Sequence, residues 1–180
     1  MHIAYDVESY PNVFTCAMED MDSDHKRVYE ISSRHNNARA LHYDISCGIF
    51  SRMYGYNNLA YDYPMIHRLM ELIDEFGVTL PAPSIASELF NHTQKLISVE
   101  WGKGWLNHVK PWEVRVQQVD LMALNHFDNS AKATSLKDIE FNTECPRMQE
   151  LPFPVGTVLT DDQIDILIDY NLNSDVFATK

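Results

Sequence analysis

Cysteine and long apolar runs are both scarce in this sequence. The three cysteines, Cys16, Cys47 and Cys145, are odd in number and widely scattered, and no two of them have the spacing of a metal-binding pair. We therefore expect reduced thiols, as in proteins of a reducing compartment. No apolar run approaches the length that spans a membrane, and Met1 is not followed by a charged and then apolar leader. These absences predict a cytoplasmic protein that does not act at a membrane.

Positive charge is scarce as well. The chain has 14 lysines and arginines against 26 aspartates and glutamates, which gives a formal net charge of −12. Such a charge argues against a broad electrostatic grip on nucleic acid. It does not exclude an acidic pocket that is filled by metal ions and takes the end of one strand. With 180 residues and 45% hydrophobic content, the chain is expected to form one domain over 1–180.

Hydrophobic periodicity predicts an α/β fold. Short β-branched or aromatic segments predict strands, and apolar residues at helical spacing predict helices. The expected strands cover 3–8, 11–18, 27–31, 54–57 and 113–119; the expected helices cover 36–53, 64–76, 84–96 and 121–124, with two more that begin at Ser135 and at a capping box, Thr160 to Gln163. Residues 141–156 hold three prolines and are expected to be a loop. We predict a mixed sheet flanked by helices, with its first three strands antiparallel.

The first expected strand has an acidic face. Side chains alternate along a strand, so Asp6 and Glu8 point to one side while Tyr5 and Val7 point to the other. Two adjacent buried carboxylates repel each other, and a divalent metal ion with oxygen ligands would offset that repulsion. The alternative is an edge strand with a solvated acidic face. The strand by itself does not decide between the two.

Two later segments carry polar residues with an ordinary structural explanation. Asp62 stands at the start of a helix, where it can act as an N-cap, and Asn58 can be a turn residue. The polar residues from Tyr170 to Asp175 can be a solvated helix end. Taken one at a time, these segments favour the structural explanation.

The segment from Trp101 to Trp112 interleaves aromatic and basic residues. Aromatic side chains beside cations can stack on the bases of single-stranded nucleic acid. The alternative, which we favour, is a hairpin or loop that tryptophan side chains pin to the core.

Taken together, three of these segments carry a resemblance. Asp6-Val7-Glu8, then Asn58-Leu59-Ala60-Tyr61-Asp62, then Tyr170 to Asp175 occur in the order of the three exonuclease motifs of the DEDD superfamily. The set resembles its members of DnaQ-like or ribonuclease H-like fold, and is most similar to proofreading domains of phage polymerase type. The resemblance spans almost the whole chain and implies a ribonuclease H-like sheet.

The resemblance also implies roles for seven residues. Two divalent ions, Mg²⁺ or Mn²⁺, would be held by four carboxylates, and oxygen ligands of this kind suit those ions. Tyr170 would position the attacking water, and Asn58 would help to place the substrate strand or Asp62. Asn171 occupies the position one helical turn before Asp175 and is a second candidate for contact with substrate. The four carboxylates belong to Asp6, Glu8, Asp62 and Asp175.

The implied activity is 3′-to-5′ exonuclease action on DNA, which releases nucleoside monophosphates. The implied partners are the 3′ end of a single strand and a polymerase domain or replication partner, in host cytoplasm if the chain is phage-encoded. Two alternatives remain open: an exoribonuclease of the same fold, and a non-catalytic module that binds nucleic acid or protein. Retention of all four carboxylates speaks against the second, since a dead domain has no need of a buried acid cluster.

The spacing of the last motif predicts an irregular helix. Four residues separate Tyr170 from Asp175, whereas the tyrosine branch of the family has three. Residues five apart in a regular α-helix lie about 140° from each other around the axis. A π-bulge would absorb the extra residue and is favoured over a helix break at residues 171–173. In either case we expect Tyr170, rather than Asn171, to point at Asp6 and Asp62.

Overall fold

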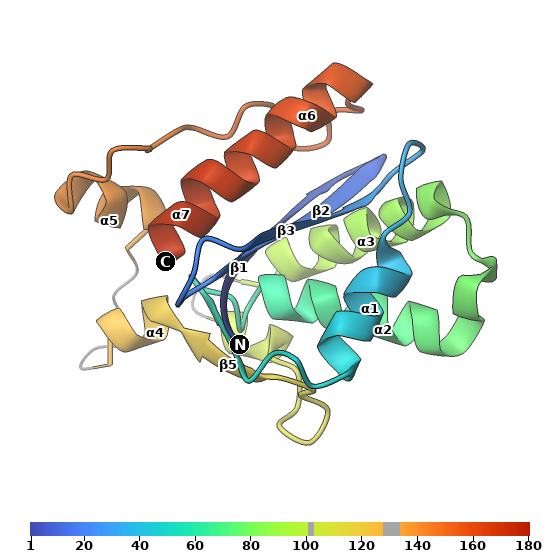
Figure 1. The fold of residues 1–180 in the computed structure, drawn as a ribbon, viewed down its shortest axis with the longest axis horizontal. Helices are drawn as coiled ribbons and strands as arrows, with labels where there is room; N and C mark the ends of the chain where they lie inside the picture. Colours follow the sequence, from blue (N-terminus) through green and yellow to red (C-terminus); the bar gives the residue numbers. More distant parts are fainter. Residues whose placement is uncertain (101–102, 128–133) are drawn as a thin grey trace.

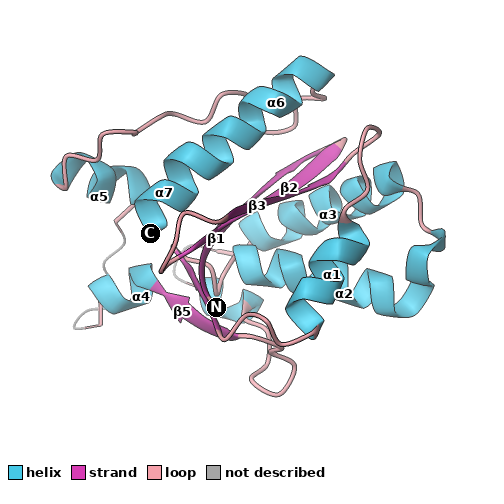
Figure 2. Cartoon of the chain, viewed as in Figure 1, coloured by secondary structure: helices cyan, strands magenta, loops and turns pink. Residues whose placement is uncertain are grey.

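The computed structural model describes residues 1–100, 103–127 and 134–180, which form a five-stranded sheet with helices on both faces (Figure 1; Figure 2). The strand order is β3-β2-β1-β4-β5. The strands are β1 (His2–Tyr10), β2 (Val13–Asp20), β3 (Lys26–Ile31), β4 (Arg52–Gly55) and β5 (Gln117–Asp120). The α/β prediction with a mixed sheet flanked by helices is confirmed.

Strand β1 lies in the middle of the sheet. It pairs antiparallel with β2, from Ile3 opposite Asp20 to Tyr10 opposite Val13, and β2 pairs antiparallel with β3. On its other side β1 pairs parallel with β4, which pairs parallel with β5. Strand β1 is held by β4 over His2–Ala4 and by β2 from Ile3 to Tyr10, and the long pairing with β2 sets the orientation of side chains along β1.

Three helices cover one face of the sheet. They are α1 (Ala38–Ser46), α2 (Asp62–Phe76) and α3 (Ala82–Ile97). Each buries one apolar side, for example Leu41 on α1, Leu69 on α2 and Leu89 on α3. These side chains share a core with Tyr5 and Val7 of β1.

A long C-terminal helical segment lies on the opposite face (Figure 1). It consists of α6 (Asp161–Tyr170), a π-helical turn (Asn171–Asp175) and α7 (Val176–Thr179). Val176 packs against Ala4 of β1 and Ala17 of β2. The predicted capping box is confirmed, since Thr160 and Gln163 exchange hydrogen bonds between side chain and backbone.

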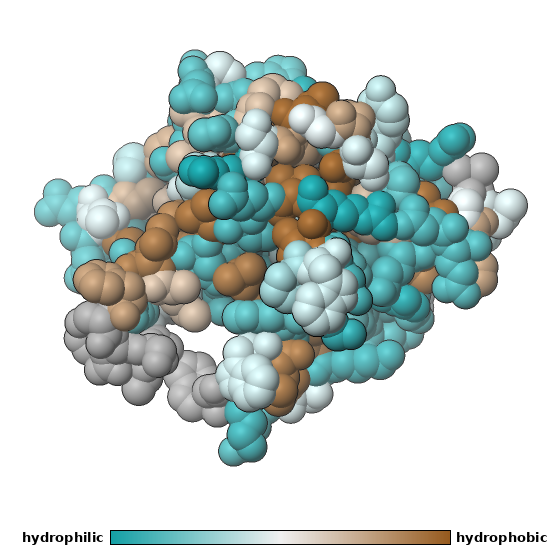
Figure 3. Space-filling model, turned by 90° about the horizontal axis from the view of Figure 1, so that it is seen from below, coloured by the Kyte–Doolittle hydropathy of each residue, from teal (hydrophilic) through white to brown (hydrophobic). Residues whose placement is uncertain are grey.

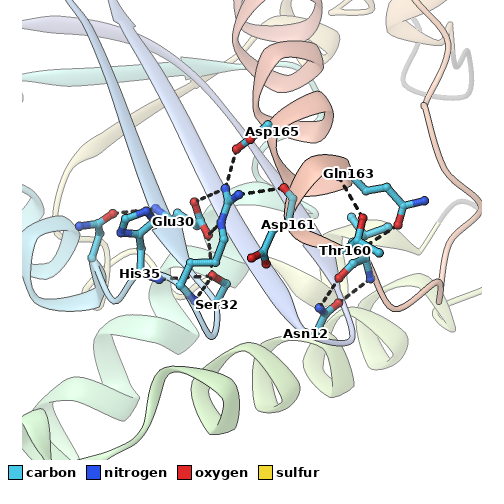
Figure 4. A network of polar contacts seen from close by, with 11 residues as sticks. Asn12, Glu30, Ser32, His35, Thr160, Asp161, Gln163 and Asp165 are labelled. Atoms are coloured by element: carbon cyan, nitrogen blue, oxygen red, sulfur yellow. Dashed lines mark hydrogen bonds and ion pairs between the residues drawn. The ribbon is translucent and has the colours of Figure 1, made fainter.

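A polar network holds the start of α6 against β3 (Figure 4). The guanidinium of Arg34 donates to both carboxylate oxygens of Glu30, to the backbone oxygen of Asp161 and to the side chain of Asp165. The side chain of Asn12 exchanges two hydrogen bonds with the backbone of Leu159. The C-terminal helical segment, which carries Tyr170 and Asp175, is therefore anchored to the sheet at its N-terminal end.

Several predicted boundaries are wrong. The helix expected over 36–53 ends at Ser46, because Gly48 adopts a φ of 77° that breaks the helix, and β4 starts at Arg52. The strand expected over 113–119 begins at Gln117. The loop expected from residue 141 begins two residues later, after α5 (Leu136–Asn142). The other short helix, α4 (Leu121–Asn125), follows β5 as predicted.

The tryptophan segment also differs from the favoured interpretation. Its described part is a 3₁₀ turn at Gly104–Asn107 followed by a loop, and Trp105 and Trp112 are exposed rather than pinned to the core. Trp101 lies outside the described residues. The three cysteines are free thiols, as predicted. Among the described residues, no helix is both long enough and apolar enough to cross a membrane.

Candidate functional site

The strand β1 and the C-terminal helical segment bring three acids together. Asp6 and Glu8 lie on the face of β1 that is turned away from α1–α3, as the alternation of side chains requires. Asp175 comes from the π-helical turn that packs on this face. One carboxylate oxygen from each of the three lies within 4.8 Å of those of the other two. The expected acidic cluster is therefore formed by residues far apart in sequence.

Asp62 joins the cluster from a third direction. It is the first residue of α2, rather than the residue that caps it, and its side chain is 3% exposed. Its Oδ1 accepts the backbone N–H of Val7 at 3.1 Å, which fixes the carboxylate beside Asp6 and Glu8. The loop before it is held by Asp120, which accepts N–H groups from Asn57 and Leu59.

The environment disfavours negative charge on these acids. Burial raises the pKa of Asp6 and of Glu8 well above their ordinary values, and the neighbouring carboxylates raise both further. Burial also raises the pKa of Asp62 to about 7, although the N–H of Val7 partly offsets this. Acids held together at this cost are typical of a site that receives cations.

The helix irregularity predicted from the spacing is confirmed as a π-helical turn. The turn spans Asn171–Asp175 inside an otherwise continuous helical segment. It absorbs one extra residue, so Tyr170 and Asp175 line the same pocket despite being five positions apart. Burial and the charge of Asp175 raise the pKa of the Tyr170 phenol, which is therefore protonated at neutral pH.

The expectation that Tyr170 would point at Asp6 in place of Asn171 is wrong. The fully buried amide of Asn171 donates to Asp6 Oδ2 at 2.6 Å, while Tyr170 lines the pocket itself. Both residues reach the site, because Asn171 faces Asp6 and Tyr170 faces the pocket. Successive residues of a helix point in directions about 100° apart, so each faces one of these two places.

Lys137 of α5 is a site residue that the sequence analysis missed. Its ammonium donates to Asp175 Oδ1 at 2.8 Å and to Ser174 Oγ at 3.2 Å, and pairs with Glu140. It also lies 5.2 Å from the centre of the Tyr170 ring. A lysine 38 positions before its partner leaves no local sequence signal, so tertiary packing alone places it here.

The side chain of Asn58 is not in the pocket. It is fully buried and donates to the hydroxyl of Tyr5 and to Gln118 Oε1, at 3.2 and 3.1 Å. Its backbone oxygen accepts the N–H of Tyr63 and so holds the first turn of α2. A Cβ at position 55 would lie 2.6 Å from the Cβ of Asn58, so any residue with a side chain would clash there, and the position is occupied by Gly55. This placement favours a role for Asn58 in positioning Asp62 rather than in contacting a substrate strand.

The acids open into a pocket of about 620 Å³. Asp6, Glu8, Asp62, Tyr170 and Asp175 line it together with Lys137. Aromatic and apolar side chains also line the pocket, among them Tyr56, Tyr61 and Met122. Asp6, Glu8 and Asp175 offer carboxylate oxygens close enough to share a cation, and oxygen donors fit Mg²⁺ or Mn²⁺ rather than zinc. The pocket combines these oxygens with a neutral phenol and an ammonium group.

Comparisons of the chain with protein-family models, with curated proteins and with solved structures find no match. The geometry and chemistry of the site are therefore the basis for assigning a function.

Proposed function

We propose that this chain is a metal-dependent 3′-to-5′ exonuclease of ribonuclease H-like fold that shortens single-stranded DNA and releases nucleoside monophosphates. The observation that carries the proposal is the convergence of Asp6, Glu8, Asp62 and Asp175 with Tyr170 in one pocket. Such a set is unexpected in a structural protein, because carboxylates crowded into one pocket repel one another and cost stability unless they serve a ligand.

The carboxylates would hold two divalent ions, which when bound stabilise the charge of a phosphodiester and lower the pKa of water. Asn171 keeps the Asp6 carboxylate in place by its hydrogen bond. Tyr170 remains protonated and can donate a hydrogen bond, so it positions a water molecule or a phosphate oxygen and does not remove a proton. Lys137 places a positive charge beside Asp175, where a phosphate would need it.

The direct test is a cleavage assay on an oligodeoxynucleotide labelled at its 5′ end. With Mn²⁺ or Mg²⁺ we expect a ladder of products that shorten from the 3′ end, and with chelator no cleavage. Asp6→Ala should abolish the ladder and leave the protein folded, because removing one of several mutually repelling acids relieves repulsion. Glu75→Gln, an exposed change on the same helix as Asp62, is the matched control and should cleave normally.

Two results would sink the proposal: wild-type turnover by Asp6→Ala, or cleavage that starts at the 5′ end. A parallel assay on the matching oligoribonucleotide decides between DNA and RNA. A polymerase domain or replication partner is the natural companion of such an activity, and the same assay with a primer–template would reveal preference for a frayed 3′ end.

A further inference from the structure

Two tryptophans stand in solvent on the connection between α3 and β5. The exposed fraction is 64% for Trp105 and 78% for Trp112. An indole ring is one of the largest apolar side chains, and leaving two of them in water sacrifices the stabilisation that burial would provide. Neither ring anchors its segment, so the segment must be held in another way.

Backbone turns and one amide hold the segment. The 3₁₀ turn at Gly104–Asn107 presents Trp105, and a turn closed by the N–H of Glu113 and the oxygen of Lys110 presents Trp112. The amide of Asn107 donates to the backbone oxygen of Leu96, at 3.0 Å, and to that of Ala60, at 3.2 Å. The tryptophans are thus displayed on a fixed support.

That support adjoins the candidate active site. Ala60, which accepts the hydrogen bond from Asn107, is followed by Tyr61 and Asp62, and both of these line the acidic pocket. A Cβ on Gly104 would also contact Ala60, at 3.4 Å. A strand whose end occupied the acidic pocket could therefore continue across this segment.

The charges near the tryptophans are largely paired. Lys103 pairs with Glu100 and Lys110 with Glu113, and the Lys110 ammonium lies 5.8 Å from the centre of the Trp112 ring. Arg68, in the groove beside the segment, is paired with Glu71 and Glu88. Paired cations leave little net charge for phosphates, so the aromatic faces are the main binding feature.

The surroundings favour a nucleic acid over a protein partner. The centre of a protein–protein interface is depleted of lysine and rich in contiguous apolar surface. Here His108 and Lys110 lie between the two tryptophans in the sequence, and Lys103 precedes Trp105. On the face seen in Figure 3, hydrophobic and hydrophilic side chains lie next to one another. Isolated aromatic faces among polar groups suit the stacking of separate bases.

We propose that Trp105 and Trp112 form a stacking surface for bases of a single strand whose 3′ end enters the acidic pocket. The choice of occupant rests on the proposed function. The binding depends on stacking more than on charge, so each tryptophan contributes about tenfold to affinity for a long strand. Short strands, which end within the pocket, do not reach the surface.

The test measures the affinity of labelled dT12 and dT4 by fluorescence anisotropy in chelator, where no cleavage occurs. Trp105→Ala and Trp112→Ala should each weaken dT12 binding by about tenfold and leave dT4 binding unchanged. Trp112→Phe should retain most of the affinity, because it keeps an aromatic face. Tyr43→Ala, which removes an exposed aromatic residue of α1, is the matched control and should bind as the wild type does.

Salt dependence and solution mass complete the test. The slope of log affinity against log salt should be the same for wild type and tryptophan variants, because no phosphate contact is lost. Unchanged dT12 affinity in both variants, or an equal loss for dT4, overturns the inference. A wild-type dimer that becomes monomeric in the tryptophan variants also overturns it, in favour of a protein interface. Since binding is read without metal, failure to cleave and failure to bind are separate results.

Discussion

At the scale of single residues, Tyr170 and Asn171 of the last motif have different roles. Tyr170 lines the pocket with a protonated phenol, whereas Asn171 is buried and holds Asp6 at 2.6 Å. One residue faces the space where a substrate would lie, and the other faces a proposed metal ligand. Their substitution should therefore change different measured quantities.

Tyr170→Phe should lower the single-turnover cleavage rate by about a hundredfold, as loss of one aligned donor does, and leave the Mn²⁺ requirement unchanged. Asn171→Ala should weaken the apparent Mn²⁺ affinity by about tenfold, because a partner that orients a metal ligand is lost. Single-turnover rates over a Mn²⁺ titration measure both effects. If the two variants altered the same parameter, the division of roles would be wrong.

Lys137 supplies positive charge to a cluster that lacks it. Its side chain is 26% exposed and its ammonium donates a hydrogen bond to Asp175, so it offsets part of the repulsion among the acids. A metal ion bound to the same acids would supply that charge in its place. The lysine should therefore matter most for stability when metal is absent.

In chelator, Lys137→Met is expected to lower the free energy of unfolding by about 1.5–3 kcal/mol, the usual contribution of a hydrogen bond between charged groups. Millimolar Mn²⁺ should shrink this deficit. Urea unfolding with and without Mn²⁺ measures both values, and Lys95→Met, a change in the last turn of α3, serves as control. An equal deficit under the two conditions would show that Lys137 and the metal do not compensate the same charge.

At the scale of elements, the C-terminal helical segment is attached to the sheet at its N-terminal end, in α6. The Arg34 side chain joins β3 to α6 through Glu30, Asp161 and Asp165 (Figure 4). Burial raises the pKa of Glu30, but the hydrogen bonds from Arg34 more than offset this, and the pKa is lowered overall. A carboxylate with a lowered pKa contributes stability above its unfolded pKa, and that contribution is lost as the pH falls through the folded pKa.

Arg34→Gln is expected to lower the free energy of unfolding by about 3 kcal/mol at pH 7, because it leaves Glu30 buried without its cation. The difference in unfolding free energy between wild type and variant should narrow as the pH falls below the ordinary range of a glutamate and through the lowered pKa of Glu30 in the wild type. Denaturant unfolding of both proteins over a pH series measures this difference in free energy. Arg39→Gln, an exposed change on α1, should show no such gap. A gap that does not vary with pH would contradict the assignment.

At the scale of the whole molecule, the candidate site joins residues from nearly the full length of the chain. Asp6 lies on β1, Asp62 begins α2, and Asp175 ends the π-helical turn. Each of these elements takes its place only when the sheet and both helical layers have formed. A ligand that bridges the three should therefore stabilise the folded molecule as a unit.

Mn²⁺ at about 100 times its dissociation constant should stabilise the wild type by about 2.7 kcal/mol. For a chain of this size that corresponds to a rise in Tm of about 5–10 °C. The rise should be smaller for Asp175→Asn and complete for the control Glu75→Gln. Thermal unfolding in a Mn²⁺ series measures all three, and an equal rise in wild type and Asp175→Asn would remove Asp175 from the ligand set.

Local chemistry determined much of this protein from the sequence by itself. The alternation of β1 places Asp6 and Glu8 on one face, the capping box at Thr160 starts α6, and the spacing of Tyr170 and Asp175 requires an irregular turn. Each of these follows from residues a few positions apart, because strand alternation, helix capping and helical repeat are local properties. The limits of the helices and strands were less accurate; for example, apolar periodicity alone did not reveal the helix break at Gly48.

Tertiary structure alone decided which distant side chains meet. The bond from Asn171 to Asp6 spans 165 positions, that from Lys137 to Asp175 spans 38, and that from Arg34 to Asp165 spans 131. The exposure of Trp105 and Trp112 was decided in the same way, against the expectation that they would pin a loop to the core. Such contacts depend on how the layers pack and on how much space remains between them, and no local pattern of residues encodes either quantity.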